Sequence, residues 1–433
     1  AVSPWQWVPS LYFAQGLPYV VVMSVAVILF KRMGMSNTDI ALYTSGLNLP
    51  WVIKPLWSPL VDLLKTKRWW IVVMQILVGA GLAGIALTIQ GPLAFRYCLA
   101  FMWLLAFSSA THDIAADGFY MLGLNEKKQA YFVGIRNTFY RFAVIFGQGI
   151  LVMFAGWLEQ RYAREMPETA AIPQAWSLTF YLLTILFALL FVYHYLFLPH
   201  PRRDTCTLPP QQASAGRVFK EFLGTFTSFF QKKHIVSALI FILLYRFAEA
   251  QLVKITSPFL LDTPATGGLA LSTAEVGFIY GTIGVIALTI GGIVGGIAMA
   301  RRGLKSCLWT MTIAMNLPNI VYLYLSFARP ESIGIISGCV AIEQFGYGFG
   351  FTSLTYFMML FSNGKHQTAH YAICTGFMAL GLMLPGMISG WIEESIGYRA
   401  FFVWIMLCTI PSFWATHLVR KNLTDNHSDN SSR

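Results

Sequence analysis

A series of long apolar runs along the whole length of this 433-residue chain constrains its fold more than any other feature. A helix needs roughly 20 mostly apolar residues to cross the hydrocarbon core of a bilayer. About twelve runs of this kind cover residues 5–30, 38–63, 69–90, 94–122, 129–157, 175–199, 235–261, 272–300, 305–327, 332–361, 368–392 and 400–420. They predict an all-α integral membrane protein.

The composition agrees with this prediction. Hydrophobic residues make up 56% of the chain and charged residues only 11%, against about 25% charged residues in a soluble domain. A soluble enzyme or nucleic-acid binder of this size is therefore excluded. The six cysteines are scattered without close pairs, so neither a disulfide framework nor a metal site is predicted, and we expect no cofactor.

The runs fall into two groups of six around the longest polar stretch. This division predicts an N-terminal six-helix bundle at 1–199, a cytoplasmic linker with an amphipathic segment at 200–234, a C-terminal six-helix bundle at 235–421 and a polar cytoplasmic tail at 422–433. The halves also share landmarks, because Gly156-Trp157-Leu158-Glu159 ends the fifth run and Gly390-Trp391-Ile392-Glu393 ends the eleventh. Such repeats are typical of transporters whose two bundles enclose a central cavity.

The excess of basic residues indicates how the chain is oriented. The net charge is +11, and with both termini in the cytoplasm the inner loops and tail hold 18 Lys and Arg residues against 7 outside. Positive residues favour the cytoplasmic side of a membrane protein. The charge therefore reflects orientation in the bilayer, and no nucleic-acid partner is needed to explain it.

Carboxylates inside the apolar runs are the first candidate site residues. Asp113 and Asp117 are four apart and share one helix face, which suits either a protonation site or a salt-bridge anchor to a neighbouring helix. Glu343 stands alone in the tenth run, and Glu249 lies in the seventh. Charged residues at this depth are costly and usually functional, so we assign all four to proton coupling, with the proton as the coupling ion.

Basic residues inside the runs predict an anionic substrate. Arginine forms forked hydrogen bonds to carboxylate or phosphate, so its partner is a small anion or an Asp on a facing helix. Arg246 and Glu249 are three apart and are expected to pair along their helix. The candidate substrate-binding residues are Lys54, Arg136, Tyr140, Arg141, Tyr245, Arg246 and Gln344.

Polar residues at the inner ends of the runs are candidates for gating. Asp62 and Arg68 flank the loop between the second and third runs, and Arg301 lies at the equivalent place in the second half. The segment resembles the loop between spans two and three of major facilitators, and this resemblance implies that these residues latch the two bundles in one state.

Several motifs resemble those of a known family. The segments Phe13-Ala14-Gln15-Gly16-Leu17-Pro18, Lys54-Pro55-Leu56-Trp57-Ser58-Pro59-Leu60-Val61-Asp62 and Ser109-Ala110-Thr111-His112-Asp113-Ile114-Ala115-Ala116-Asp117 look like those of the AmpG-type muropeptide permeases. So do Leu244-Tyr245-Arg246, Ala274-Glu275-Val276-Gly277 and the stretch from Glu343 to Trp391. The likeness covers most of the chain and implies a major facilitator fold.

The resemblance also implies a function. Members of this family import N-acetylglucosaminyl-1,6-anhydro-N-acetylmuramic acid, with or without peptide, across the bacterial inner membrane with protons. We accordingly predict a monomeric secondary active transporter, not an enzyme, whose partners are a small anionic sugar or sugar-peptide and the lipid bilayer. The alternatives are an importer of another oligosaccharide or organic anion, a drug exporter of the same fold, a membrane sensor and a membrane enzyme.

Overall fold

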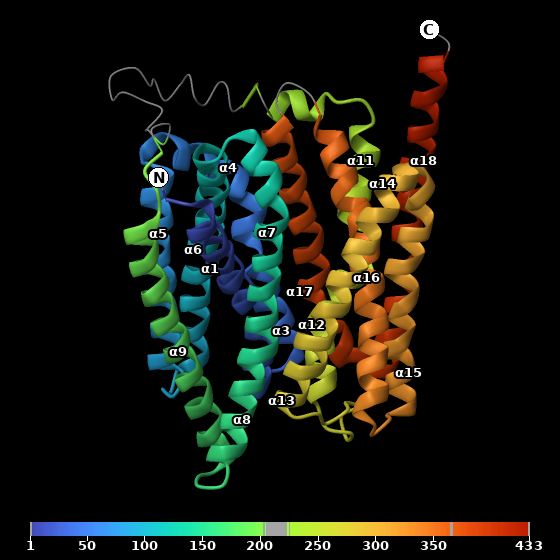
Figure 1. The fold of residues 1–433 in the computed structure, drawn as a ribbon. Coiled ribbons are helices and arrows are strands. Elements are labelled where there is room, and N and C mark those ends of the chain that lie inside the picture. Colours follow the sequence, from blue (N-terminus) through green and yellow to red (C-terminus); the bar gives the residue numbers. More distant parts are fainter. Residues whose placement is uncertain (1, 202–203, 205–222, 225, 364–366, 432–433) are drawn as a thin grey trace. The chain divides into compact units, whose positions relative to one another are not determined.

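The computed structural model describes residues 2–201, 204, 223–224, 226–363 and 367–431 (Figure 1). Side chains at 59–60, 62–63, 126–127, 129–131, 133–134, 367–368 and 423–431 lie outside this description. Every regular element in the described ranges is a helix. The predicted all-α class is therefore confirmed. Most of the expected amphipathic segment of the linker, residues 217–222, lies outside the described residues.

Contacts between residues divide the chain into two compact units. Unit 1 consists of Ala1–Met35, Leu56–Gln212 and Leu271–Thr282, and unit 2 of Ser36–Pro55, Ala213–Ala270 and Ile283–Arg433. Each unit thus contains a short segment from the other half of the sequence. The division into two six-helix bundles stays a prediction.

Unit 1 is built from most of the helices of the first half and from the start of the eighth run. Its elements are η1 (Pro4–Gln6), α1 (Val8–Val20), η2 (Val21–Val25), α2 (Ala26–Arg32), most of α4 (Leu49–Leu64), α5 (Lys67–Thr88), α6 (Ala94–Gly123), α7 (Glu126–Val144), η3 (Ile145–Leu151), α8 (Val152–Tyr162), α9 (Glu168–Phe197), α13 (Thr273–Val276) and most of η4 (Gly277–Gly284). The segments η2, η3 and η4 are π-helical and continue neighbouring α-helices.

Unit 2 holds the remaining helices. Its elements are α3 (Asn37–Gly46), α11 (Ile235–Leu244), α12 (Phe247–Leu261), α14 (Val285–Asn316), η5 (Leu317–Asn319), α15 (Ile320–Ala328), α16 (Ile333–Ser362), α17 (Gln367–Leu407) and α18 (Ile410–Ser431). The core of this unit includes Phe241, Leu308, Met311 and Leu354, none of which is exposed to solvent.

Two long helical stretches each contain two of the predicted runs. Eight helices in the described residues are long and apolar enough to cross a membrane, and two of these stretches, Thr273–Ala328 and Ala369–Asn422, are 56 and 54 residues long. At 1.5 Å per residue, either is roughly twice as long as one crossing requires. Each bends at a glycine with positive φ, Gly303 at 72° and Gly397 at 78°, which separates the two runs.

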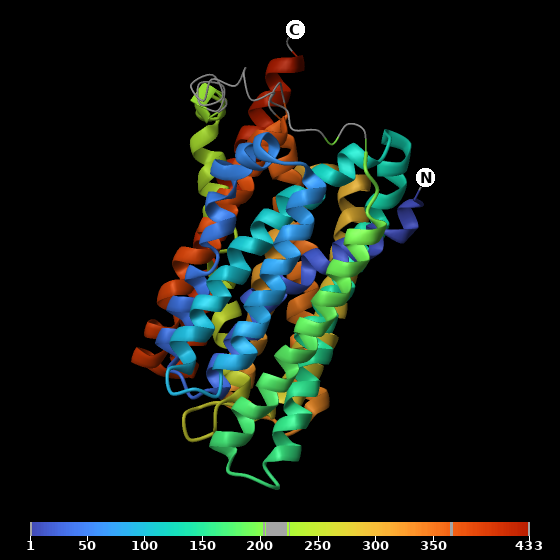
Figure 2. The same cartoon turned by 90° about the vertical axis from the view of Figure 1, so that its left-hand side faces the viewer.

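Small residues bring the helices of unit 1 close together. A Cβ added at Gly84 of α5 would collide with the ring of Phe101 of α6, and one at Gly81 would lie 3.1 Å from Leu105. Figure 2 shows α5 and α6 in blue beside the green helix α9, which also packs against α5. These three helices therefore form a tight layer in which polar side chains can meet.

Large apolar side chains cover outer surfaces of both units. Leu189 is 63% exposed in unit 1, and Ile342 is 59% exposed in unit 2. A water-soluble protein rarely exposes many such side chains, whereas a lipid bilayer accommodates them.

Candidate functional site

A polar cluster joins three helices of unit 1, and we call it the N-terminal cluster. The Tyr12 hydroxyl of α1 donates to Asp117 Oδ1 of α6 at 3.0 Å, and Arg136 Nη1 of α7 donates to the Tyr12 oxygen at 2.9 Å. Arg136 Nη1 also lies 3.4 Å from Asp117 Oδ1. The expected Asp partner for a buried arginine is thus present on a facing helix.

Further contacts fix this cluster in place. The Arg136 guanidinium lies 4.9 Å and 5.0 Å from the ring centres of Tyr12 and Tyr120, within the range of cation–π attraction. Asp113 accepts a hydrogen bond from Gln15 Nε2 of α1. The two aspartates predicted to share a face therefore both face α1, but only Asp117 reaches Arg136 within 4.0 Å.

The other predicted substrate-binding residues of α7 and α4 are Tyr140, Arg141 and Lys54. A Cβ at Gly16 would lie 3.1 Å from the Tyr140 carbonyl oxygen, so α1 and α7 touch there. Arg141 forms no hydrogen bond or ion pair with any residue that the structure describes. Lys54 belongs to the part of α4 in unit 2 and is half-buried.

Two buried carboxylates form a second cluster in unit 2, and we call it the C-terminal cluster. Glu343 of α16 is 1% exposed, and its Oε2 accepts hydrogen bonds from Tyr322 at 3.0 Å and from Gln344 at 2.9 Å. Glu249 of α12 is 4% exposed and close enough for its charge to interact with that of Glu343. One oxygen of each carboxylate has no hydrogen-bond partner among the described residues.

The expected ion pair between Arg246 and Glu249 is wrong. Arg246 lies at the break between α11 and α12 with φ −106° and ψ 21°, so the helical spacing that would align the two side chains does not apply. Its guanidinium instead donates to the Tyr347 hydroxyl and lies 5.1 Å and 5.0 Å from the rings of Tyr347 and Phe351. Its charge still interacts with that of Glu249 at longer range.

Tyr245, which precedes Arg246, and Lys254 of α12 are both buried. The Tyr245 hydroxyl donates to the Gly350 carbonyl at 3.0 Å and lies 2.8 Å from Ser353 Oγ, which ties α11 to α16. Lys254 is only 2% exposed and has no ion pair or hydrogen bond with the residues that the structure describes. It is the kind of buried cation that an anionic ligand would neutralise.

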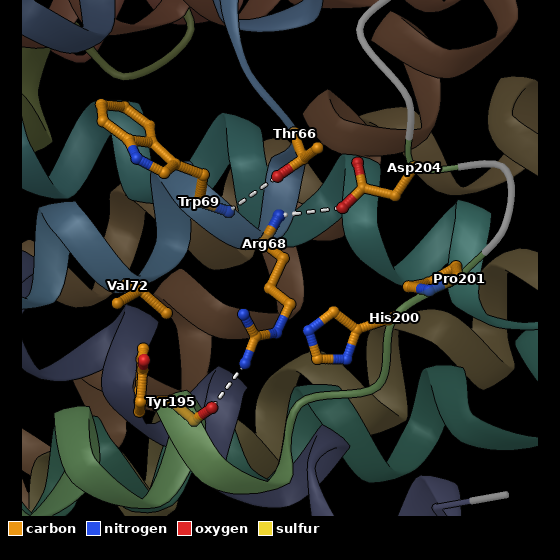
Figure 3. A pocket seen from close by; sticks show the side chains of 8 residues that line it. All are labelled: Thr66, Arg68, Trp69, Val72, Tyr195, His200, Pro201 and Asp204. Atoms are coloured by element: carbon orange, nitrogen blue, oxygen red, sulfur yellow. Dashed lines mark hydrogen bonds between the residues drawn. The ribbon is translucent and has the colours of Figure 1, made fainter.

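The predicted gating residues are placed only in part. The side chain of Asp62 lies outside the described residues, and Arg301 is exposed. Arg68 lines a pocket of about 230 Å³ in unit 1 (Figure 3). There its guanidinium donates to the carbonyl of Tyr195, while its backbone N–H donates to Asp204 at 3.1 Å.

Asp204 thereby fastens the beginning of the linker to α5. The other carboxylate oxygen of Asp204 accepts from the Lys67 N–H at 2.7 Å. The N–H groups of Lys67 and Arg68 both belong to the first turn of α5, where no backbone carbonyl of the helix is available to accept from them. A carboxylate at a helix N-terminus is favourable because it satisfies these donors and complements the helix dipole. In this state Arg68 and Asp204 join α5 to the end of α9.

A buried glutamate at the end of the fifth run binds three partners in unit 1. Glu159 Oε2 accepts from Thr273 Oγ1 at 2.7 Å and from Arg32 Nε at 3.1 Å, and its Oε1 accepts from Trp176 Nε1 at 2.8 Å. A Cβ at Gly156 would collide with the backbone of the residue after Thr273, so α13 lies directly on α8.

The matching glutamate of the eleventh run makes an equivalent contact in unit 2. Asn37 Nδ2 donates to Glu393 Oε2 at 2.7 Å and to the Tyr398 oxygen at 2.8 Å, and the Tyr398 hydroxyl donates to Asp262 at 2.6 Å. A Cβ at Gly390 would collide with the carbonyl of Asn37. Each of the two repeated Gly-Trp-x-Glu segments thus contacts the first residues of a helix from the opposite half of the sequence, α13 in unit 1 and α3 in unit 2.

Several of these residues were not among the sequence candidates. Tyr12 and Gln15 lie in or beside one of the quoted motifs, and Glu159 and Glu393 in the repeat, but neither signal assigns them a partner. Tyr322 carries no sequence signal, because an isolated tyrosine in an apolar run is usual in a membrane helix.

Comparison with known proteins places this geometry in a family. The Major Facilitator Superfamily profile matches residues 10–368. A "Putative transporter AmpG 4" of Rickettsia conorii is 25% identical over 93% of both chains. The "Anhydromuropeptide permease" of Escherichia coli K12 is 24% identical over 95% of this chain and 79% of its own.

Solved structures share the fold. A D-xylose-proton symporter matches with a TM-score of 0.70 at 13% identity, covering 95% of this chain and 96% of its own. The nucleoside transporter NupG matches with a TM-score of 0.65 at 13% identity, covering 95% of this chain and 98% of its own. The predicted major facilitator fold is confirmed.

Proposed function

Because this chain belongs to the Major Facilitator Superfamily, we propose that it is a proton-coupled importer of anhydromuropeptides for cell-wall recycling. As a member, it is a multi-pass membrane protein and a secondary transporter rather than an enzyme. The proposed substrate is N-acetylglucosaminyl-1,6-anhydro-N-acetylmuramic acid, with or without peptide. The name of the Escherichia coli relative supports this choice of substrate.

The arginine of the N-terminal cluster carries the proposal. Arg136 is held by Asp117 and two tyrosine rings, yet the guanidinium has five N–H donors and these partners use few of them. The lactyl carboxylate of a muropeptide would accept from the remaining donors as a forked pair. Tyr140, Arg141, Arg246, Lys54 and Gln344 are the further residues proposed to contact the substrate, with Tyr245 supporting Arg246 from behind.

The C-terminal cluster is the proposed place of proton coupling. The charges of the two buried carboxylates interact, and each carboxylate has an oxygen without a hydrogen-bond partner among the described residues, so either can take up a proton. Glu343 and Glu249 would bind a proton on one side of the membrane and release it on the other. Asp113 and Asp117 are proposed to take part in the same cycle. When the substrate carboxylate binds Arg136, Asp117 would lose Arg136 as its partner.

Alternating access would require contacts at both ends of the helices to open in turn. In the predicted orientation, the hydrogen bonds of Glu159 with Thr273 and of Glu393 with Asn37 lie at the outer ends of their helices. Asp62, Arg68 and Arg301 are proposed to act at the inner ends. We place the protein in the bacterial inner membrane as a monomer with both termini in the cytoplasm.

Uptake of labelled anhydromuropeptide into membrane vesicles tests this function. We expect accumulation under an imposed pH gradient, and loss of accumulation when a proton uncoupler is added. Competition by unlabelled disaccharides without the lactyl carboxylate should be weak. Accumulation that ignores the uncoupler would contradict proton coupling, and strong competition by neutral sugars would favour another oligosaccharide as substrate.

A further inference from the structure

A chain of hydrogen bonds between buried side chains crosses unit 1 next to the N-terminal cluster. We call it the histidine chain, and it consists of Ser10 of α1, Gln75 of α5, His112 of α6 and His194 of α9. Gln75 is 1% exposed, His112 is 2% exposed and His194 is completely buried. Polar and ionisable side chains at this depth of a membrane protein are costly and usually functional.

The amide nitrogen of Gln75 contacts both imidazole rings. Gln75 Nε2 lies 3.1 Å from His112 Nε2 and 2.9 Å from His194 Nδ1. With the amide in this orientation its nitrogen donates to both ring nitrogens, and the ring protons are then on His112 Nδ1 and His194 Nε2. His194 Nε2 donates to Ser10 Oγ at 2.9 Å, and the Ser10 hydroxyl donates to the Trp7 carbonyl at 3.2 Å.

The far end of the chain is left incomplete. His112 Nδ1 is buried and has no hydrogen-bond partner among the residues that the structure describes. An unsatisfied buried donor costs about 1–3 kcal/mol.

We propose that the histidine chain is a second proton-binding site of this transporter and that His112 takes up the proton at Nε2. The inference rests on the proton coupling proposed above. One N–H bond forms on His112, the proton comes from the acidic side of the membrane, and no other covalent bond changes. The Gln75 amide then turns so that its oxygen accepts from the new N–H.

The structure already contains what this rotation needs. His194 Nδ1 lies 2.9 Å from Gln75 Nε2 and 3.0 Å from Gln75 Oε1, so it can keep the amide nitrogen as its donor while the oxygen turns to His112. His194 and Ser10 then keep their own donors unchanged. Gln75 is thus a positioning residue that can serve both protonation states of His112.

The charged neighbours connect this site to the N-terminal cluster. Asp113 follows His112 on α6, about 100° around the helix, and the charges of the two side chains interact. From α9 the facing titratable group is His194, whose charge would interact with that of His112. From α5, Lys67 packs against Gly118, six residues further along α6. A proton on His112 would therefore interact with the carboxylate of Asp113, which Gln15 of α1 binds.

Nitrogen-15 NMR of the full chain labelled on histidine tests the site directly. At rest we expect the Nδ1–H tautomer for His112 and the Nε2–H tautomer for His194, and on lowering the pH an imidazolium signal that His112→Gln removes. His370→Gln is the matched control, because His370 is also buried, 4% exposed, but lies in unit 2 beside Ser228. The proposal would be overturned if every imidazolium signal of the wild type survives in His112→Gln. It would also be overturned if no imidazolium signal of His112 appears over the pH range of transport.

Vesicle uptake gives a second, independent measurement. We expect His112→Gln to keep substrate exchange but to lose the pH dependence of accumulation seen in the wild type and in His370→Gln. An unchanged pH profile would refute the site. Because the NMR measurement needs no substrate, a failure of the muropeptide assay in the wild type would count against the proposed substrate and leave the proton site standing.

Discussion

The hydroxyl of Thr273 and the carboxylate of Glu159 are joined by a 2.7 Å hydrogen bond, although 114 positions separate them in the sequence. The same carboxylate oxygen also binds Arg32, so one buried glutamate connects α2, α8 and α13. Hydrogen bonds to charged groups are worth about 1.5–3 kcal/mol each. A single substitution at Glu159 should therefore weaken the contacts of all three helices.

Replacing Glu159 by Gln should lower the stability of the protein. The amide removes the negative charge that Arg32 Nε binds and leaves Arg32 with only its exposed partner Glu168 among the described residues. Glu159 is only 6% exposed, so solvent compensates little for the lost charge. We expect a loss of about 1.5–3 kcal/mol in a thermal or denaturant unfolding experiment. The matched control is Glu165→Gln, which breaks the exposed pair with Arg161 and should change stability by less than about 0.5 kcal/mol. Equal effects of the two variants would contradict this prediction.

Alanine at Gly390 or Gly156 should prevent the helix starts from docking. At both positions a methyl group would collide with the backbone of the opposing segment. Gly338→Ala is the control, because a Cβ there meets nothing within 4 Å and alanine favours a helix by about 1 kcal/mol. We expect a cysteine at Asn37 to become accessible to thiol reagents only in Gly390→Ala. Protection that persists in this variant would show that Gly390 and Asn37 are not in the close contact that the structure shows.

Arg136 should be required for binding the anionic substrate. Arg136→Gln removes the charge and the forked donors, and we expect uptake at low substrate concentration to fall at least about tenfold, the equivalent of one charge-assisted hydrogen bond. Arg136→Lys keeps the charge but not the fork and should be intermediate. Arg164→Gln, at an exposed position, should leave uptake unchanged. Full activity of Arg136→Gln would exclude the proposed role.

Glu343 should be needed for accumulation but not for exchange. Glu343→Gln keeps a hydrogen-bonding group for Tyr322 while removing the group that can gain or lose a proton. We expect exchange of labelled for unlabelled substrate to continue, whereas uptake driven by a pH gradient is lost. Tyr322→Phe should retain gradient-driven uptake with a stability loss of about 1 kcal/mol. Gradient-driven uptake by Glu343→Gln would refute the assignment.

Lys254→Met should separate function from stability. The lysine is buried without a partner in the described part of the chain, so removing its charge should raise the free energy of unfolding by about 1 kcal/mol or more. If the ammonium meets the substrate, uptake should fall in the same variant. Lys233→Met alters an exposed lysine and controls for the loss of charge. A destabilised Lys254→Met would point to a partner on the lysine instead.

The helices themselves could be predicted well from the sequence, because apolar length is a local property. The break at Gly303 and the one at Gly397 also followed from the spacing of the runs. The pairing of a buried arginine with an aspartate on a facing helix was anticipated in kind, and Asp117 with Arg136 satisfies it.

Contacts between distant residues could not be predicted in this way. His112, Gln75 and His194 come from three helices, and no spacing rule relates them. The Arg246–Glu249 pair was predicted from helical spacing and failed because the helix is interrupted at Arg246. Sequence patterns indicate which residues are unusual, whereas their partners depend on packing between helices.

The π-helical segments change how variants of this protein should be designed. Hydrogen bonds in a π-turn join residues i and i+5, so such a turn contains more residues than an α-helical turn. This applies to Val21–Val25, Ile145–Leu151 and Gly277–Gly284. The angular phase of the side chains is reset across such a turn. A scan with substitutions every third or fourth position would therefore drift from the cluster-facing side to the lipid-facing side within one helix, and the count has to restart after each segment.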